Sequence, residues 1–140
     1  MMQNDQWKIK IECWPAFLNR CDIELSNGQL LVIVSAFEAH QDNGSAYPLV
    51  ISPSRAATFK QDIEALLTHP TEQQSLVIAD GISIKLQLVQ DGRTMTRTIH
   101  SIESDTPEQA FFLELIDFIS SKLNQDELSK YLQKLRQDYL

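Results

Sequence analysis

Residues 77–100, VIADGISIKLQLVQDGRTMTRTIH, decide the fold of this chain. They contain two Asp-Gly pairs, Asp80-Gly81 and Asp91-Gly92, and this dipeptide is a strong signal for the type I′ turn of a β-hairpin. With each pair at the centre of a turn, the second hairpin pairs Leu88 with Met95. Both turns then independently place the same apolar side chains on one face, namely Ile82, Ile84, Leu86 and Leu88. A one-residue slip in either hairpin would break this agreement. We therefore expect a three-stranded antiparallel meander.

The same register places a charged residue among the apolar ones. Arg97 falls opposite Leu86, on the face predicted to be buried. In one interpretation, Arg97 belongs to an edge strand, lays its aliphatic stem on the core and extends its charged head to water. In the other, it pairs with a carboxylate from a covering helix, for example Asp117.

The first third of the chain reads as strands. Residues 7–13 and 21–25 alternate between apolar and polar, the period of a half-buried strand. Ser26-Asn27-Gly28 supplies a turn. The nearly continuous apolar run from Leu30 to Phe37 predicts a strand near the centre of the sheet, and residues 49–51 predict a short strand.

Three helices follow from capping signals. Ser52-Pro53 is typical of a helix start, and the helix should end at His69-Pro70. Thr106-Pro107-Glu108-Gln109 is a capping box that opens a second helix, and residues 124–127 are a similar box before a third. We predict an α+β fold, in which a mainly antiparallel sheet is packed against one mid-chain helix and two C-terminal helices. Residues 1–140 are expected to form a single domain.

The negative charge of the chain is concentrated in residues 103–127. The chain has 12 bases and 19 acids, a net charge of −7, and this window alone carries −6. Four of its seven acids stand at the two predicted helix starts, namely Asp105, Glu108, Asp126 and Glu127. The helix dipole favours acids at these positions. The remaining three, Glu103, Glu114 and Asp117, are the candidate residues for binding a basic partner.

Several classes of chemistry find no support in the sequence. His40, His69 and His100 have no second ligand at metal-binding spacing, so we predict no metal site. Cys13 and Cys21 are not spaced as a redox pair, and two free thiols are expected. No phosphate-binding, dinucleotide-binding or catalytic motif occurs. We therefore predict no cofactor and no catalytic residue, and expect a protein that is not an enzyme. An enzyme whose site is assembled from residues far apart in the sequence is the least favoured of three hypotheses.

Two binding functions fit the sequence, and they differ in the kind of protein that is bound. A small acidic domain without catalytic motifs is typical of an immunity protein that neutralises a cognate bacterial toxin, because an acidic surface complements a basic toxin. The alternative is a small secretion chaperone or adaptor that binds an effector protein, and a homodimer is left open. The pI near 4.8 argues against nucleic acid as a partner. No apolar run is long enough for a membrane span, and no secretory signal is apparent, so a cytoplasmic location is expected.

Overall fold

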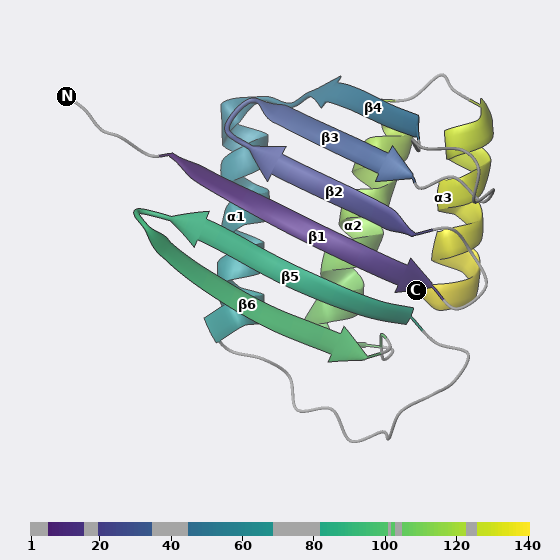
Figure 1. Ribbon diagram of the computed structural model, residues 1–140. Helices are drawn as coiled ribbons and strands as arrows, with labels where there is room; N and C mark the ends of the chain where they lie inside the picture. Colours follow the sequence, from purple (N-terminus) through teal and green to yellow (C-terminus); the bar gives the residue numbers. More distant parts are fainter. Residues whose placement is uncertain are drawn as a thin grey trace, which may run out of the picture.

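The fold is a six-stranded antiparallel sheet with three helices packed on one face (Figure 1). The computed structural model describes residues 6–15, 20–34, 45–68, 82–100, 102, 105–122 and 126–140. Its elements in chain order are β1 (Trp7–Pro15), β2 (Cys21–Ser26), β3 (Gln29–Val34), β4 (Ser45–Val50), α1 (Pro53–Thr68), β5 (Ile82–Gln90), β6 (Arg93–His100), α2 (Pro107–Ser121) and α3 (Asp126–Tyr139). The predicted α+β class is confirmed, with one mid-chain helix and two C-terminal helices.

The strand order is β4-β3-β2-β1-β5-β6. The first four strands form a meander in which neighbours along the chain are neighbours in the sheet. The β5–β6 hairpin is then added on the other side of β1, so that β1 pairs with β2 and with β5. As a result, strands from both halves of the chain meet at β1.

The predicted register of the Asp91-Gly92 hairpin is confirmed. Leu88 pairs with Met95 and Leu86 pairs with Arg97. Asp91 and Gly92 have φ angles of 53° and 77°, which are the positive values that a type I′ turn requires at both central positions. The other predicted turn, Asp80-Gly81, lies outside the described residues.

The position of β3 differs from the prediction. The apolar run that begins at Leu30 was expected near the centre of the sheet, whereas β3 stands second from an edge, between β2 and the edge strand β4. Leu30 and Val32 point into the core and are fully buried. Leu31 and Ile33 point to the opposite face and are only half-buried. The continuous run therefore reflects apolar side chains on an open face and not burial between two layers.

The helices begin where the capping signals predict. The Ser52 side chain accepts a hydrogen bond from the Arg55 amide at 3.2 Å, and α1 ends at Thr68, directly before the predicted stop. Thr106 caps α2 by accepting from the Gln109 amide at 3.2 Å, and the Gln109 side chain accepts from the Asp105 amide in return.

The core lies between the sheet and the helices. The inner face of the sheet contributes the residues that alternate along β1, β2 and β5, and α2 contributes a broad apolar arc that includes Phe111, Phe112 and Leu115. Phe59 of α1 meets Phe111 edge to face, with ring centroids 6.0 Å apart. All three helices are used for the inner face, so the other face of the sheet has no helix over it among the described residues (Figure 1).

Candidate functional site

Two of the three predicted partner-binding acids lie on the exposed side of α2. Glu114 forms an ion pair with Arg55 of α1, with 3.0 Å between Oε1 and a guanidinium nitrogen. Asp117 forms an ion pair with Arg136 of α3, also at 3.0 Å. The two acids thus point to different neighbours and link the helices to one another. The third predicted acid, Glu103, lies outside the described residues.

Another carboxylate, which the sequence analysis did not single out, lies in the same groove as Glu114. Asp62 of α1 faces α2 across a groove of about 260 Å³, which Glu114 also lines. The rest of the groove is apolar and includes Leu66, Ala110 and Phe111. No hydrogen bond or ion pair holds the Asp62 carboxylate within the described part of the chain. We refer to Asp62, Glu114 and Asp117 as the acidic helix face.

The electrostatics of this groove disfavour a second negative charge. Partial burial raises the pKa of the Asp62 carboxyl, the charge of Glu114 raises it further, and Arg55 lowers it. Arg55 is held in place by Glu114 and by the rings of Phe59 and Phe118, which lie 4.8 and 5.4 Å from the guanidinium carbon. One arginine therefore balances only one of two neighbouring carboxylates, and a cation from outside would relieve the remaining repulsion.

Arg97 is paired with a carboxylate from a covering helix, but the predicted partner is wrong. Its guanidinium donates to Glu108 at 2.8 Å and to the Leu66 carbonyl at 2.9 Å. The pair is deeply buried, with side-chain exposures of 13% for Arg97 and 5% for Glu108. It joins β6, the C-terminal end of α1 and the first turn of α2. Asp117 is instead exposed and bound to Arg136.

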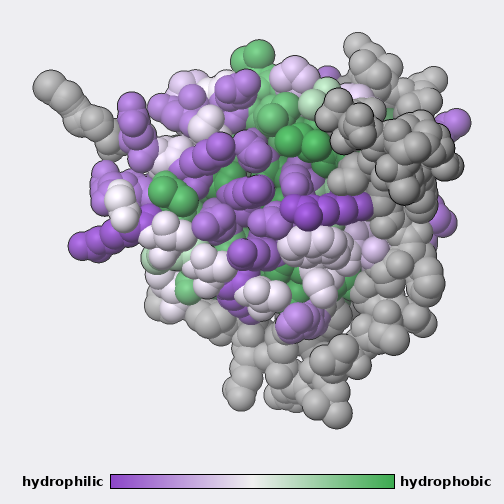
Figure 2. All heavy atoms as spheres, in the orientation of Figure 1, coloured by the Kyte–Doolittle hydropathy of each residue, from purple (hydrophilic) through white to green (hydrophobic). Residues whose placement is uncertain are grey.

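The open face of the sheet is a second surface of interest, and Figure 2 shows it directly. Polar and charged side chains cover its middle, and an apolar area lies over β3 and β4 at the top of the view (Figure 2). This area consists of outward-pointing residues of the two strands, in which Leu31 pairs with Pro48 and Ile33 with Ala46. Together with Val50, these four residues form what we call the apolar strip. Val50 is 83% exposed.

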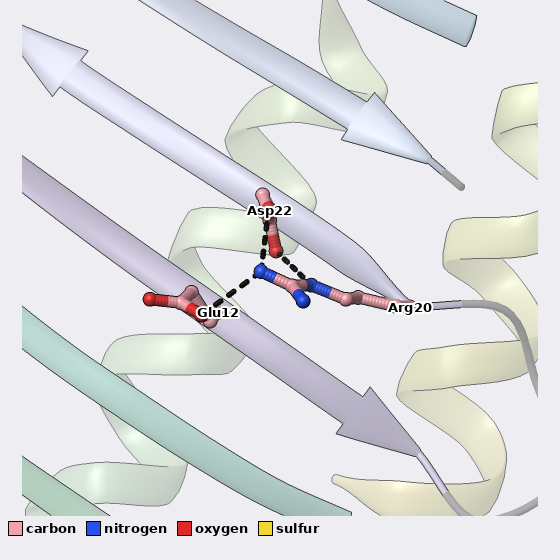
Figure 3. Close-up of polar contacts among 3 residues, drawn as sticks. All are labelled: Glu12, Arg20 and Asp22. Carbon is pink, nitrogen blue, oxygen red and sulfur yellow. Dashed lines mark hydrogen bonds and ion pairs between the residues drawn. The ribbon is translucent and has the colours of Figure 1, made fainter. Parts of the chain in front are cut away.

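An ordered charged cluster lies on the same face, at one end of β1 and β2 (Figure 3). Arg20 donates to Asp22 at 2.9 and 3.1 Å and to Glu12 at 2.9 Å. Its guanidinium carbon lies 4.7 Å from the ring centroid of Trp14, which is 39% exposed. The hydrogen bond to Asp22 is the main reason why the pKa of Arg20 is raised. Arginine and tryptophan held rigidly at a surface are typical of protein–protein contacts.

Sequence reasoning missed this surface for identifiable reasons. The apolar strip was visible as the unbroken hydrophobic run of β3, but that run was interpreted as a strand at the centre of the sheet. Arg20 was not considered, although it stands eight residues from Glu12 and two from Asp22. Its role depends on the register of β1 against β2, in which Glu12 and Asp22 are direct partners.

The thiols and the one described histidine do not form a site. Cys13 and Cys21 are direct partners on β1 and β2, both buried and both free. Burial raises the pKa of Cys13, and it raises that of Cys21 to about 12, so neither thiol ionises readily near neutral pH. His100 is exposed on β6. Across the ranges that the structure describes, no three metal-ligating side chains converge.

Two further observations bear on function. None of the described helices combines the length and the apolar character needed to cross a membrane. Neither a scan against protein-family models nor a search of curated proteins found a match to this sequence.

Proposed function

We propose that this protein is a non-enzymatic binding protein that neutralises a cognate bacterial toxin by covering it with an acidic surface. The observation that carries the proposal is the pair of carboxylates, Asp62 and Glu114, beside an apolar groove with a single arginine between them. A lysine or arginine of a basic partner has both features that match this groove, an aliphatic stem and a cationic head.

The ion pairs already present on the acidic helix face do not prevent such binding. The Glu114–Arg55 and Asp117–Arg136 pairs are exposed, and exposed pairs contribute only about 0–1 kcal/mol. A base of the partner can therefore share the Glu114 carboxylate with Arg55, or replace Arg136 at Asp117, with little loss of stability. Glu103 lies outside the described residues, and its part in binding stays a prediction from the sequence.

A secretion chaperone that binds an effector protein is the second candidate function. The apolar strip favours it, because such proteins hold extended segments by strand addition or in apolar grooves. Pro48 works against strand addition at β4, since proline lacks the amide donor that a new strand would need. We therefore rank this function below toxin neutralisation.

The identity of the partner is tested by affinity purification from the native host, followed by mass spectrometry. A small basic toxin as the main specific partner, together with rescue of growth when this protein is co-expressed with that toxin, is the expected result. An effector that remains soluble and exportable only with this protein would favour the chaperone.

The binding surface is tested with two triple variants of equal net charge. Glu103→Lys, Glu114→Lys and Asp117→Lys change the predicted acids, whereas Glu64→Lys, Asp91→Lys and Asp138→Lys change three acids elsewhere. We expect the first set to raise the Kd for the toxin at least about 100-fold and the second about tenfold or less. Equal losses in both sets would mean that only net charge matters, and no loss in the first set would exclude this surface.

A further inference from the structure

We propose that two copies of this protein associate through the open faces of their sheets. The proposal does not rest on toxin neutralisation, and it leaves the acidic helix face of each copy exposed. It starts from the apolar strip, of which Ala46, Pro48 and Val50 are exposed and Leu31 and Ile33 are half-buried. Contiguous apolar surface of this kind on a soluble protein commonly marks an interaction site.

The charge of the open face selects a second copy as the partner. Among the residues that the structure describes, this face carries four bases (Lys8, Lys10, Arg20 and Lys85) and three acids (Glu12, Asp22 and Glu24), a net charge of +1, whereas the whole chain carries −7. Two copies of a protein at −7 repel each other, and the repulsion is smallest where bases and acids balance. A strongly basic partner would instead favour the helices.

The arrangement of side chains suits a two-fold axis that lies between the sheets and runs across the strands. Such an axis places each strand over its own counterpart in the opposite direction, so the apolar strip of one copy meets the apolar strip of the other. On β1 it brings Lys10 of one copy toward Glu12 of its partner. On β2 it brings Asp22 toward Glu24, and the repulsion between these two acids is reduced because Asp22 is paired with Arg20 and Glu24 with Lys8 within each copy. Both residues lie on the open face, because they alternate with the buried Ile9, Ile11 and Cys13.

The size of the face is sufficient for a stable dimer. Six strands spaced about 4.8 Å apart, each six to nine residues long, form a face of roughly 600–900 Å². A standard protein interface buries about 800 Å² on each partner. Association edge to edge at β4 is less suitable, because Pro48 removes a backbone donor from that edge strand.

The test is the molar mass of the full-length protein in solution, measured by sedimentation equilibrium over a range of concentrations. We expect twice the monomer mass of 16.0 kDa. Val50→Glu should raise the dimer Kd at least about tenfold, because it places an unpaired charge in the apolar strip of each copy. Gln61→Glu, which adds the same charge on exposed α1, should leave the Kd within about twofold.

A second variant separates apolar contact from net charge. Val50→Lys lowers the net negative charge of each copy, but it should still weaken the dimer if the apolar strip is the interface. A stronger dimer with Val50→Lys, or an unchanged dimer with Val50→Glu, would overturn the proposal. The proposal would also be overturned if the protein remained a monomer from about 1 to about 500 μM. This holds even if that monomer bound an extended apolar peptide at the apolar strip. These outcomes need no toxin, so they are independent of the proposed function.

Discussion

The two faces of the sheet are built from the same strands, but they differ in how far their charged residues are exposed to water. On the inner face, Arg97 is paired with a buried carboxylate, Glu108, in the space between sheet and helices. On the open face, Arg20 lies between two carboxylates at a surface where its side chain is 37% exposed. Nearly the same hydrogen-bond distances occur in both clusters. What differs is access to water, and this access determines how much each arginine contributes to stability.

The largest contrast is expected when each arginine is replaced by methionine. Arg97→Met takes the guanidinium away from the buried carboxylate of Glu108, so we expect a loss of about 3–5 kcal/mol in the free energy of unfolding. Arg20→Met leaves two partly exposed carboxylates that water can solvate, and we expect a loss of about 1 kcal/mol or less. Urea titration monitored by circular dichroism measures both.

The double variant Arg97→Met, Glu108→Leu is the control for this comparison. It removes both charges, so it should be more stable than Arg97→Met alone. If Arg97→Met and Arg20→Met proved equally destabilising, burial could not be the cause of the difference.

A second contrast compares adjacent leucines on β3 that point to opposite faces. Leu30→Ala opens a cavity in the core, because Leu30 is fully buried, and should lower the free energy of unfolding by about 2–4 kcal/mol. Leu31→Ala removes the same atoms from the open face and should lower it by less than about 1 kcal/mol when the protein is monomeric. Denaturation at low protein concentration makes this measurement. A large loss from Leu31→Ala under those conditions would mean that the open face is covered within one chain.

The smallest effect on stability is expected at Asp62, which lies on α1 and not on the sheet. Because the pKa of Asp62 is raised in the folded state, the fold binds a proton there more readily than the unfolded chain does. This contribution to stability is therefore lost as pH rises from the ordinary aspartate pKa through the raised one. Asp62→Asn should increase the free energy of unfolding at neutral pH by a few tenths of a kcal/mol, since the site is partly exposed.

The pH dependence provides the control for Asp62. The gain from Asp62→Asn should disappear below about pH 3, where the carboxyl is protonated in both states. A gain that persists at that pH would come from packing and not from charge. Asp138→Asn, at an exposed acid paired with Lys134, should show no such gain.

Local signals in the sequence predicted the elements that depend on neighbouring residues. The turn at Asp91-Gly92 determines the β5–β6 register, and Ser52 and Thr106 mark the starts of two helices. The order of the strands was beyond such signals, because the pairing of β1 with β5 joins residues far apart in the chain.

The partner of Arg97 shows why the candidate site was harder to predict than the fold. Glu108 and Asp117 are nine positions apart on α2, which at about 100° per residue places them on opposite sides of the helix. Which of these sides faces β6 depends on how α2 crosses the sheet. Glu108 also stands in the first turn of a helix, a position that explains an acid without any partner. Its role in the core therefore became apparent only with the packing of α2 on the sheet.

The position of β1 between the two halves of the chain has a consequence for synthesis on the ribosome. Ile9 pairs with Leu88, which emerges 79 residues later. At about 5–20 residues per second, β1 has no neighbour on that side for about 4–16 s. An unpaired strand edge invites association with other nascent chains, and lysine side chains along a strand are a common defence against it. Lys8 and Lys10 on β1 stand where they can provide this defence until β5 is synthesised.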